Sequence, residues 1–334
     1  MSNVVETTNR QDASPTDAAP VFYLVVPCYN EQEMLPTTTQ VLGAKLTELV
    51  DAGLAAPASR VVYVDDGSSD DTWQLIASTH EADPRFCGVK LSRNRGHQNA
   101  LLAGLEFSVS RADVIGSMDA DLQDDVNALN EMLARTREGY EVVYGVRSSR
   151  ETDTGFKRTT AQGFYKFQHA MGVQSVYNHA DFRVMSARAV QGLLSFGEVN
   201  LFLRGMVPQV GYRSCTVEYE RAARAAGESK YPLRKMLSFA IDGITSFSTK
   251  PMRIIAILGM VISVLGLGVL IYALIANFAF NDTVRGWTST IASIWFLGGL
   301  QLLAIGVVGE YVGKTYLESK HRPRYLIDTV LEDD

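Results

Sequence analysis

The stretch "RVVYVDDGSSDDT", Arg60–Thr72, decides the fold class. Its first half is a short, β-branched apolar run, which is typical of a buried strand. Two aspartates end the run, and the Gly-Ser pair that follows supplies a turn. A helix through Trp73 and Ile76 comes next. Strand, turn and helix in this order form the repeating unit of an α/β protein.

The same unit recurs on both sides of this stretch. Before it, "VFYLVVP" (Val21–Pro27) predicts a buried strand, and residues 31–50 predict a helix. The runs after it are the strands "FCGVKLS", "ADVIGSM" and "YEVVYGV" and the helices "GHQNALLAGLEFS" and Val126–Arg137. The alternation predicts a mostly parallel sheet with helices on both faces. Ligands bind such sheets outside the carboxyl ends of the strands.

Composition excludes several classes of protein. The chain of 334 residues carries a net charge of −6, which argues against a nucleic-acid binder. Its cysteines, Cys28, Cys87 and Cys215, are far apart without metal-site spacing, so we interpret them as free or buried thiols in a reducing compartment. Residues 1–19 are polar and lack a signal peptide's apolar centre, which predicts a disordered tail.

Two uncharged apolar stretches lie near the C-terminus, Ile254–Phe280 and Trp287–Val308. About 20 apolar residues suffice to cross a bilayer. We therefore predict two transmembrane helices, at about 254–280 and 287–310, within residues 251–313. A buried hairpin of a soluble core is the alternative.

The charges that flank these stretches predict an orientation. Cations precede the first stretch and follow the second, whereas the connecting loop offers only Arg285. The positive-inside rule places the domain of residues 20–220 and both termini in the cytoplasm, with residues 314–334 as a cytoplasmic tail. The basic segment 221–250 predicts a juxtamembrane amphipathic helix. The chain is thus expected to be a multi-pass protein of the cell inner membrane.

Acidic and amide side chains follow three of the predicted strands. Asn30 and Glu31 follow the first, Asp65 and Asp66 end the second, and Asp119 and Asp121 end the fourth. Because the carboxyl ends of parallel strands share one edge, these groups are expected to form one site.

The run "SMDADLQDD", Ser117–Asp125, places four carboxylates within seven positions. Asp119 and Asp121 are two apart in extended chain and point to the same side. Two carboxylates with open positions suit Mg²⁺ or Mn²⁺ bound together with a diphosphate. The alternative is that the acids favour the N-terminus of the following helix.

Six motifs along the chain resemble those of a known family of enzymes. They are "VVPCYNE", "VDDGSSDDT", "SRNRGHQNALLAGL", "DADLQDD", "ADFRVMS" and "GESKYPLRKMLSFAIDGITSFSTKP". In this order they resemble the family 2, GT-A fold polyprenyl-phosphate glycosyltransferases, which include bactoprenol glucosyltransferases and dolichyl-phosphate mannose synthases. The resemblance covers about residues 21–326 and implies a GT-A catalytic domain followed by the membrane hairpin.

The resemblance also implies a donor site. Its nucleoside-binding residues would be Pro27, Tyr29, Asn30, Glu31 and Asp66, with Asp66 facing the base. Asp119 would bridge the ribose and the metal, and Asp121 and Gln123 would complete the Mg²⁺ or Mn²⁺ site. The structural alternatives are that Tyr29 only packs and that Asp66 only closes a turn.

The implied reaction is an inverting hexosyl transfer from a nucleotide sugar, with UDP-glucose expected, to undecaprenyl phosphate at the cytoplasmic membrane face, for cell-envelope glycosylation. A phosphate monoester is largely dianionic at neutral pH, so it needs little deprotonation to act as the nucleophile. Catalysis would then rest on positioning and on neutralising the leaving diphosphate. Asp181 matches an acid essential in relatives and would be either a base or an orienting group.

Four cations are implied on the acceptor side. Arg147 and Arg183 match arginines that face phosphate groups, and Arg224 and Lys230 would capture the polyprenyl phosphate. Either arginine could instead form an ion pair, Arg183 with Asp181, and the basic segment could bind lipid headgroups. Relatives with this hairpin can form homo-oligomers, so a tetramer is a further expectation.

Two other functions are the alternatives to this one. A processive family 2 polysaccharide synthase would carry a QxxRW motif, but none of the three tryptophans follows an arginine. An inactive membrane-tethered scaffold would be favoured by the loss of an Asp-x-Asp acid, and neither acid is lost.

Overall fold

The computed structural model describes residues 18–147, 179–199, 201–220, 249–280 and 287–333. Within them one mixed sheet has the strand order β7-β5-β6-β4-β1-β2-β3-β8. The strands are β1 (Phe22–Cys28), β2 (Arg60–Asp65), β3 (Phe86–Leu91), β4 (Val114–Ser117), β5 (Val142–Arg147), β6 (His179–Ser186), β7 (Ser214–Tyr219) and β8 (Ile327–Leu331).

The middle of the sheet is parallel, as predicted. Strand β1 pairs in parallel with β2 and β4, and β2 pairs in parallel with β3. Strand β6 runs antiparallel to both β4 and β5, and β8 runs antiparallel to β3. The sheet is therefore mixed, because β6 and β8 enter it against the direction of their neighbours.

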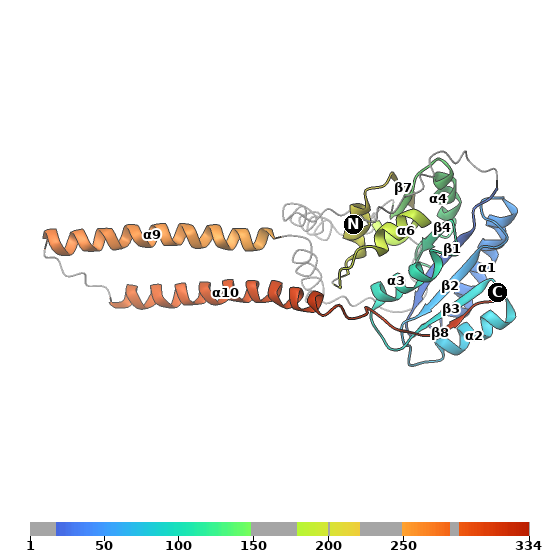
Figure 1. Ribbon diagram of the computed structural model, residues 1–334, viewed down its shortest axis with the longest axis horizontal. Helices are drawn as coiled ribbons and strands as arrows, with labels where there is room; N and C mark the ends of the chain where they lie inside the picture. Colours follow the sequence, from blue (N-terminus) through green and yellow to red (C-terminus); the bar gives the residue numbers. More distant parts are fainter. Residues whose placement is uncertain (1–17, 148–178, 200, 221–248, 281–286, 334) are drawn as a thin grey trace, which may run out of the picture.

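Helices cover both faces of the sheet (Figure 1). They are α1 (Leu35–Asp51), α2 (Thr72–Ala82), α3 (His97–Ser108), α4 (Ala128–Arg137), α6 (Ala187–Leu194), α7 (Leu203–Met206) and the 3₁₀ helix η1 (Val207–Val210). Side chains alternate along β1, so that Leu24 packs in a core cluster with α1 and α4, whereas Val25 packs with α3 and α6. The two layers of helices, one on each face of the sheet, thereby fix the position of the strand ends.

Gly104 explains how closely α3 lies on the sheet. A Cβ atom at this position would come within 2.3 Å of Val25 Cγ1 and 2.8 Å of Val64 Cγ2. Only a residue without a side chain fits there. This contact fixes the helix whose first residue, His97, lines the pocket described below.

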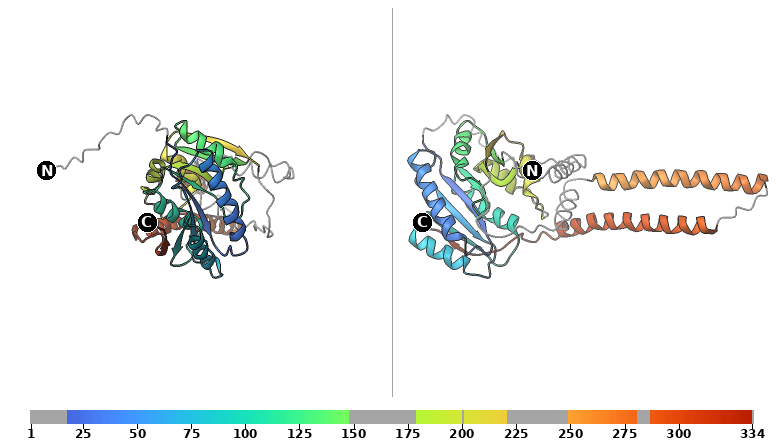
Figure 2. Two further views of the ribbon diagram at one scale, coloured as in Figure 1. Left: turned by 90° about the vertical axis from the view of Figure 1, so that its right-hand side faces the viewer. Right: turned by 180° about the vertical axis from the view of Figure 1, so that it is seen from behind.

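Two long helices occupy the apolar stretches, α9 (Lys250–Phe280) and α10 (Trp287–Ser319). They extend side by side away from the α/β domain (Figures 1 and 2). Within the residues whose side chains the structure describes, no helix has both the length and the apolarity that a membrane crossing requires. Insertion of this hairpin in a membrane stays a prediction. The predicted N-terminal tail, up to residue 17, and the juxtamembrane segment, up to residue 248, lie outside the described residues.

The chain after α10 returns to the α/β domain. Residues 327–331, within the segment predicted as a tail, form strand β8 on the edge of the sheet beside β3. The C-terminus therefore lies on the domain and not beside the hairpin (Figure 1).

Candidate active site

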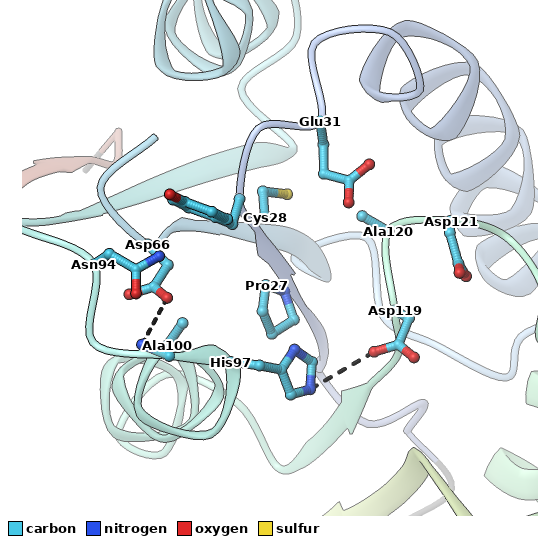
Figure 3. A pocket seen from close by; sticks show the side chains of 12 residues that line it. Pro27, Cys28, Glu31, Asp66, Asn94, His97, Ala100, Asp119, Ala120 and Asp121 are labelled. Carbon is cyan, nitrogen blue, oxygen red and sulfur yellow. Dashed lines mark hydrogen bonds and ion pairs between the residues drawn. The ribbon is translucent and has the colours of Figure 1, made fainter. Parts of the chain in front are cut away.

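A cavity of about 310 Å³ opens at the carboxyl ends of β1, β2 and β4. Its lining residues are Pro27, Cys28, Tyr29, Glu31, Asp66, Asn94, Gly96, His97, Ala100, Asp119, Ala120 and Asp121 (Figure 3). The structure thus brings together most of the predicted donor-site residues at one sheet edge. Asn30 and Gln123, also predicted for this site, are not among the lining residues.

Asn30 ties the loop after β1 to the loop after β2. Its backbone is left-handed, with φ of 55°, a conformation that asparagine tolerates better than most residues. Its side-chain oxygen accepts a hydrogen bond from the Ser69 N–H at 2.9 Å, and its own N–H donates to Ser68 Oγ at 3.0 Å. The Glu31 N–H donates to Thr72 Oγ1 at 2.9 Å. Asn30 therefore shapes the pocket wall.

Asp66 supports a second wall. It is buried, and its two carboxylate oxygens accept the N–H groups of Arg95 at 2.7 Å and Gly96 at 2.8 Å. Burial raises the pKa of Asp66, although these two hydrogen bonds act in the opposite direction. Each carboxylate oxygen has a second lone pair, so contact with a base stays a prediction.

Asp119 and Asp121 lie on the loop after β4. Asp121 Oδ1 accepts the backbone N–H of Gln123 at 3.2 Å, and Gln123 is 5% exposed. Burial, together with the negative charge of Asp181, Asp124 and Asp121, raises the pKa of Asp119 despite the opposing effect of His97. Negative charge is thus concentrated where a cation was predicted.

The donor set on this loop fits a hard divalent cation only in part. No group of three or more acidic, histidine or cysteine side chains in the described residues could hold a metal ion. Mg²⁺ and Mn²⁺ commonly need just one or two carboxylates because substrate phosphates complete the shell. Asp119 and Asp121 fit that requirement, whereas Gln123 does not line the cavity and its place in the shell stays a prediction.

His97 joins this loop to a cluster of charges that centres on Asp181. Its Nε2 atom lies 3.6 Å from both Asp119 Oδ1 and Asp181 Oδ2. The His97 and Asp119 side chains point toward one another in Figure 3. Burial lowers the pKa of His97, but the hydrogen bond with Asp181 and the two negative charges outweigh it, so the net pKa is raised.

Two arginines complete the cluster. Arg183 Nη2 donates to Asp181 Oδ1 at 2.5 Å, and Arg204 Nη2 donates to Oδ2 at 3.0 Å. Burial would raise the pKa of Asp181, but the hydrogen bond from His97 and the two positive charges hold it well below its usual range. Arg183 is 1% exposed, and its Nε and Nη1 groups have no hydrogen-bond partner among the described residues.

His97 and Arg204 were not among the predicted site residues. His97 lies within the quoted motif "SRNRGHQNALLAGL", which was the available signal. Arg204 lies in α7, where no pattern in the sequence marks it.

Arg147 lies in a different ion pair. Its Nη2 donates to the buried Asp124 Oδ1 at 3.1 Å, and Tyr219 donates its hydroxyl to the same oxygen at 2.5 Å. Its role toward phosphate groups stays a prediction. Arg224 and Lys230 lie outside the described residues.

Comparisons with known proteins identify the family of the chain. Residues 23–194 match the model of glycosyl transferase family 2, and residues 250–315 match the GtrB C-terminal hairpin. YkoT, an uncharacterized glycosyltransferase of Bacillus subtilis (strain 168), is 48% identical over 319 residues, which cover 94% of this chain and 93% of YkoT. The bactoprenol glucosyl transferase of Shigella phage SfV is 37% identical over 91% of this chain and 97% of its own length.

A similarity of low identity links the chain to one solved structure. The mannosyltransferase PcManGT from Pyrobaculum calidifontis, in complex with GDP-Man and Mn²⁺, aligns with a TM-score of 0.47 and 16% identity over 93% of this chain and 88% of its own. The family model matches more than half of the chain and the sequence relatives cover nearly all of it, so the chain belongs to glycosyltransferase family 2.

Proposed function

We propose that this enzyme, a hexosyltransferase, transfers glucose from UDP-glucose to undecaprenyl phosphate at the cytoplasmic face of the membrane. One observation carries the proposal. Similarity to a bactoprenol glucosyl transferase spans nearly the whole chain, so that it includes both the catalytic domain and the hairpin. The product, a polyprenyl-phosphate glucose, would serve cell-envelope glycosylation.

The donor would occupy the cavity at the sheet edge. Tyr29 is 48% exposed at this cavity and offers an aromatic surface to a base. Asp119, Asp121 and Gln123 would hold Mg²⁺ or Mn²⁺. When bound, the cation would act as a Lewis acid that neutralises charge on the leaving diphosphate.

The acceptor phosphate would meet the Asp181 cluster. An oxygen of the phosphate dianion attacks the anomeric carbon, the bond from that carbon to the diphosphate oxygen breaks, and the configuration inverts. Because the dianion already carries a lone pair for attack, no base is required. Arg183 and Arg204 are both held by Asp181, and His97 Nε2 lies 3.6 Å from both Asp181 and Asp119, so the two guanidinium groups supply positive charge next to the proposed donor site. Guanidinium groups suit phosphate oxygens.

The hairpin would anchor the enzyme in the bilayer. Large apolar side chains project outward from both helices, for example Val264 at 66% exposure and Leu302 at 72%. Soluble proteins rarely leave such a continuous apolar surface uncovered. Lipid, or the hairpins of further copies in a homo-oligomer such as a tetramer, would cover it.

Transfer to lipid tests the proposal directly. Purified full-length protein with Mn²⁺ or Mg²⁺, radiolabelled UDP-glucose and undecaprenyl phosphate should yield a labelled lipid. Asp121→Ala should abolish the label, whereas Asp51→Ala, an exposed acid at the end of α1, should not. Label in a long polymer would instead identify a processive synthase. Label that stays water-soluble with every donor tested would identify an inactive scaffold.

A further inference from the structure

The chain that follows the hairpin packs along the domain that holds the pocket. We call residues Pro323–Glu332 the C-terminal segment. Its strand β8 pairs with β3, and the carbonyl of Leu326 accepts the Ser92 N–H at 2.9 Å. At its far end, Glu332 forms a two-point ion pair with Arg111 at 2.5 and 2.9 Å. The segment is therefore an integral part of the α/β domain.

Arg95 connects the C-terminal segment to the pocket. Its guanidinium donates to the carbonyl of Arg324 from Nε at 2.7 Å and to that of Pro323 from Nη2 at 3.0 Å. Its backbone N–H donates to Asp66 Oδ1 at 2.7 Å. One residue thus joins a buried pocket carboxylate to the chain that leaves the hairpin.

The loop of residues 92–96 is held tightly between these two attachments. Its residues Asn94 and Gly96 line the cavity. Behind it, a Cβ atom on Gly67 would come 2.5 Å from the Asn94 nitrogen. Gly67 is also left-handed, with φ of 67°. The loop therefore packs tightly against Gly67, and the hydrogen bonds of Arg95 attach it to the C-terminal segment as well.

The same region of the chain reaches the second side of the site. Arg324 Nη2 donates to the carbonyl of Phe196, and Glu318 Oε1, near the end of α10, accepts the Val199 N–H at 2.7 Å. This stretch precedes α7, which carries Arg204. The end of the hairpin is thereby joined to the chain just before α7 as well as to the loop that lines the cavity.

We propose that Arg95 is a positioning residue for the nucleoside diphosphate, through which the C-terminal segment fixes the donor pocket. The inference rests on the proposed function, because it assumes that this pocket takes such a donor. A wall that is already ordered loses less conformational freedom when ligand binds, so affinity improves without a direct contact.

Arg95→Ala in the full-length protein tests the proposal. It removes two hydrogen bonds to the C-terminal segment and leaves every backbone group in place. The dissociation constant for UDP with Mn²⁺, measured by calorimetry, should rise about five- to tenfold. The KM for UDP-glucose should rise with it, while the kcat and the KM for the acceptor stay near their wild-type values. Arg111→Ala is the matched control, since it releases the far end of the segment and should leave UDP affinity within about twofold.

Truncation after Arg322, which removes the Pro323 and Arg324 carbonyls that Arg95 binds, separates positioning from direct contact. It removes β8 but keeps Arg95, and folding is checked by circular dichroism. UDP affinity should fall as it does in Arg95→Ala. If Arg95→Ala weakens UDP while the folded truncation does not, Arg95 contacts the nucleotide itself and the proposal is overturned.

Amide hydrogen exchange, measured on the protein without nucleotide, tests the link between the C-terminal segment and the pocket separately from the proposed function. The amides of Arg95 and Gly96, both bonded to Asp66, should exchange faster in the truncated protein than in wild type. Unchanged exchange would overturn the coupling, whatever the donor. Faster exchange with no nucleoside diphosphate bound by wild type would instead refute the proposed donor and leave the mechanical link standing.

Discussion

Asp181 is the residue whose chemistry the structure constrains most. Oδ1 accepts from Arg183 Nη2 and, at 3.4 Å, from Arg204 Nε. Oδ2 accepts from Arg204 Nη2 and lies 3.6 Å from His97 Nε2. A carboxylate oxygen offers two lone pairs, so both of those on Oδ1 and one of those on Oδ2 already accept a guanidinium N–H. This geometry favours an orienting role over a role as base.

The pH profile of turnover distinguishes the two roles. Asp181→Asn should lower kcat by about a hundredfold or more, because two guanidinium groups lose their shared anchor. In the wild type, activity should fall on the acid side near pH 6, where the acceptor phosphate takes up its second proton. The same acid limb should persist in the residual activity of Asp181→Asn. An acid limb that disappears in this variant would show that Asp181 is the base.

Stability should respond to the same carboxylate. The pKa of Asp181 is held well below its usual range in the folded chain, so folding is favoured while the group is ionised. That contribution is fully present above the unfolded pKa of about 4 and is lost as the pH falls through the lower folded value. The difference in melting temperature between wild type and Asp181→Asn should therefore be largest above about pH 5 and shrink toward about pH 3. A difference that does not change with pH would contradict this linkage.

The metal should bind together with the nucleotide. In the proposed site, two carboxylates and one amide would form an incomplete shell for Mn²⁺, which the diphosphate of the donor would complete. UDP should therefore tighten Mn²⁺ binding by at least about tenfold, as measured from the spin resonance of free Mn²⁺. Asp121→Asn should lose this effect, whereas Asp125→Asn on the same loop should keep it. Chelation should abolish turnover, and equal Mn²⁺ affinity with and without UDP would argue against a shared site.

At the scale of elements, the sequence predicted those that repeat locally. Each βα unit carries its own apolar run, turn residues and helix, so β1 to β4 and the helices between them were predictable. Strand β8 was not, because "IDTVL" is short and its pairing with β3 is set by contacts about 240 positions away along the chain. Nothing in the sequence near β6 predicts that this strand runs antiparallel to its neighbours β4 and β5 either.

The residues of the candidate site show the same difference between those that a local pattern marks and those that only the folded chain brings together. The positions of Asp66, Asp119 and Asp121 at the cavity were predictable because each lies within a few residues of the end of a strand on the shared edge. Arg204 was not, since it reaches Asp181 from a short helix that only the folded chain brings near. Local pattern thus predicts the donor side better than the charges around Asp181.

The packing of α3 yields a prediction for one element. Gly104→Val would place side-chain atoms where Val25 and Val64 already lie, so α3 must shift or the core must expand. Overpacking of this kind costs about 1–3 kcal/mol, and the melting temperature should fall by several degrees. Turnover should fall further than stability alone explains, since the shift moves His97. Gly197→Ala, which has open space around it, is the control and should change neither. An unchanged melting temperature in Gly104→Val would show that the helix is not fixed by this contact.

At the scale of the whole molecule, the hairpin is the feature that the α/β domain does not explain. Val264 and Leu302 are mostly exposed, and lipid is the environment that the proposed acceptor requires. A lysine at the centre of a membrane helix costs about 2.5–3.5 kcal/mol, so two of them oppose insertion strongly. Wild type should float with liposomes on a density gradient, and Val264→Lys combined with Leu302→Lys should remain at the bottom. Thr37→Lys with Gln40→Lys on exposed positions of α1 adds the same charge and should still float. If the hairpin variant floats as well as wild type, its helices do not lie in hydrocarbon.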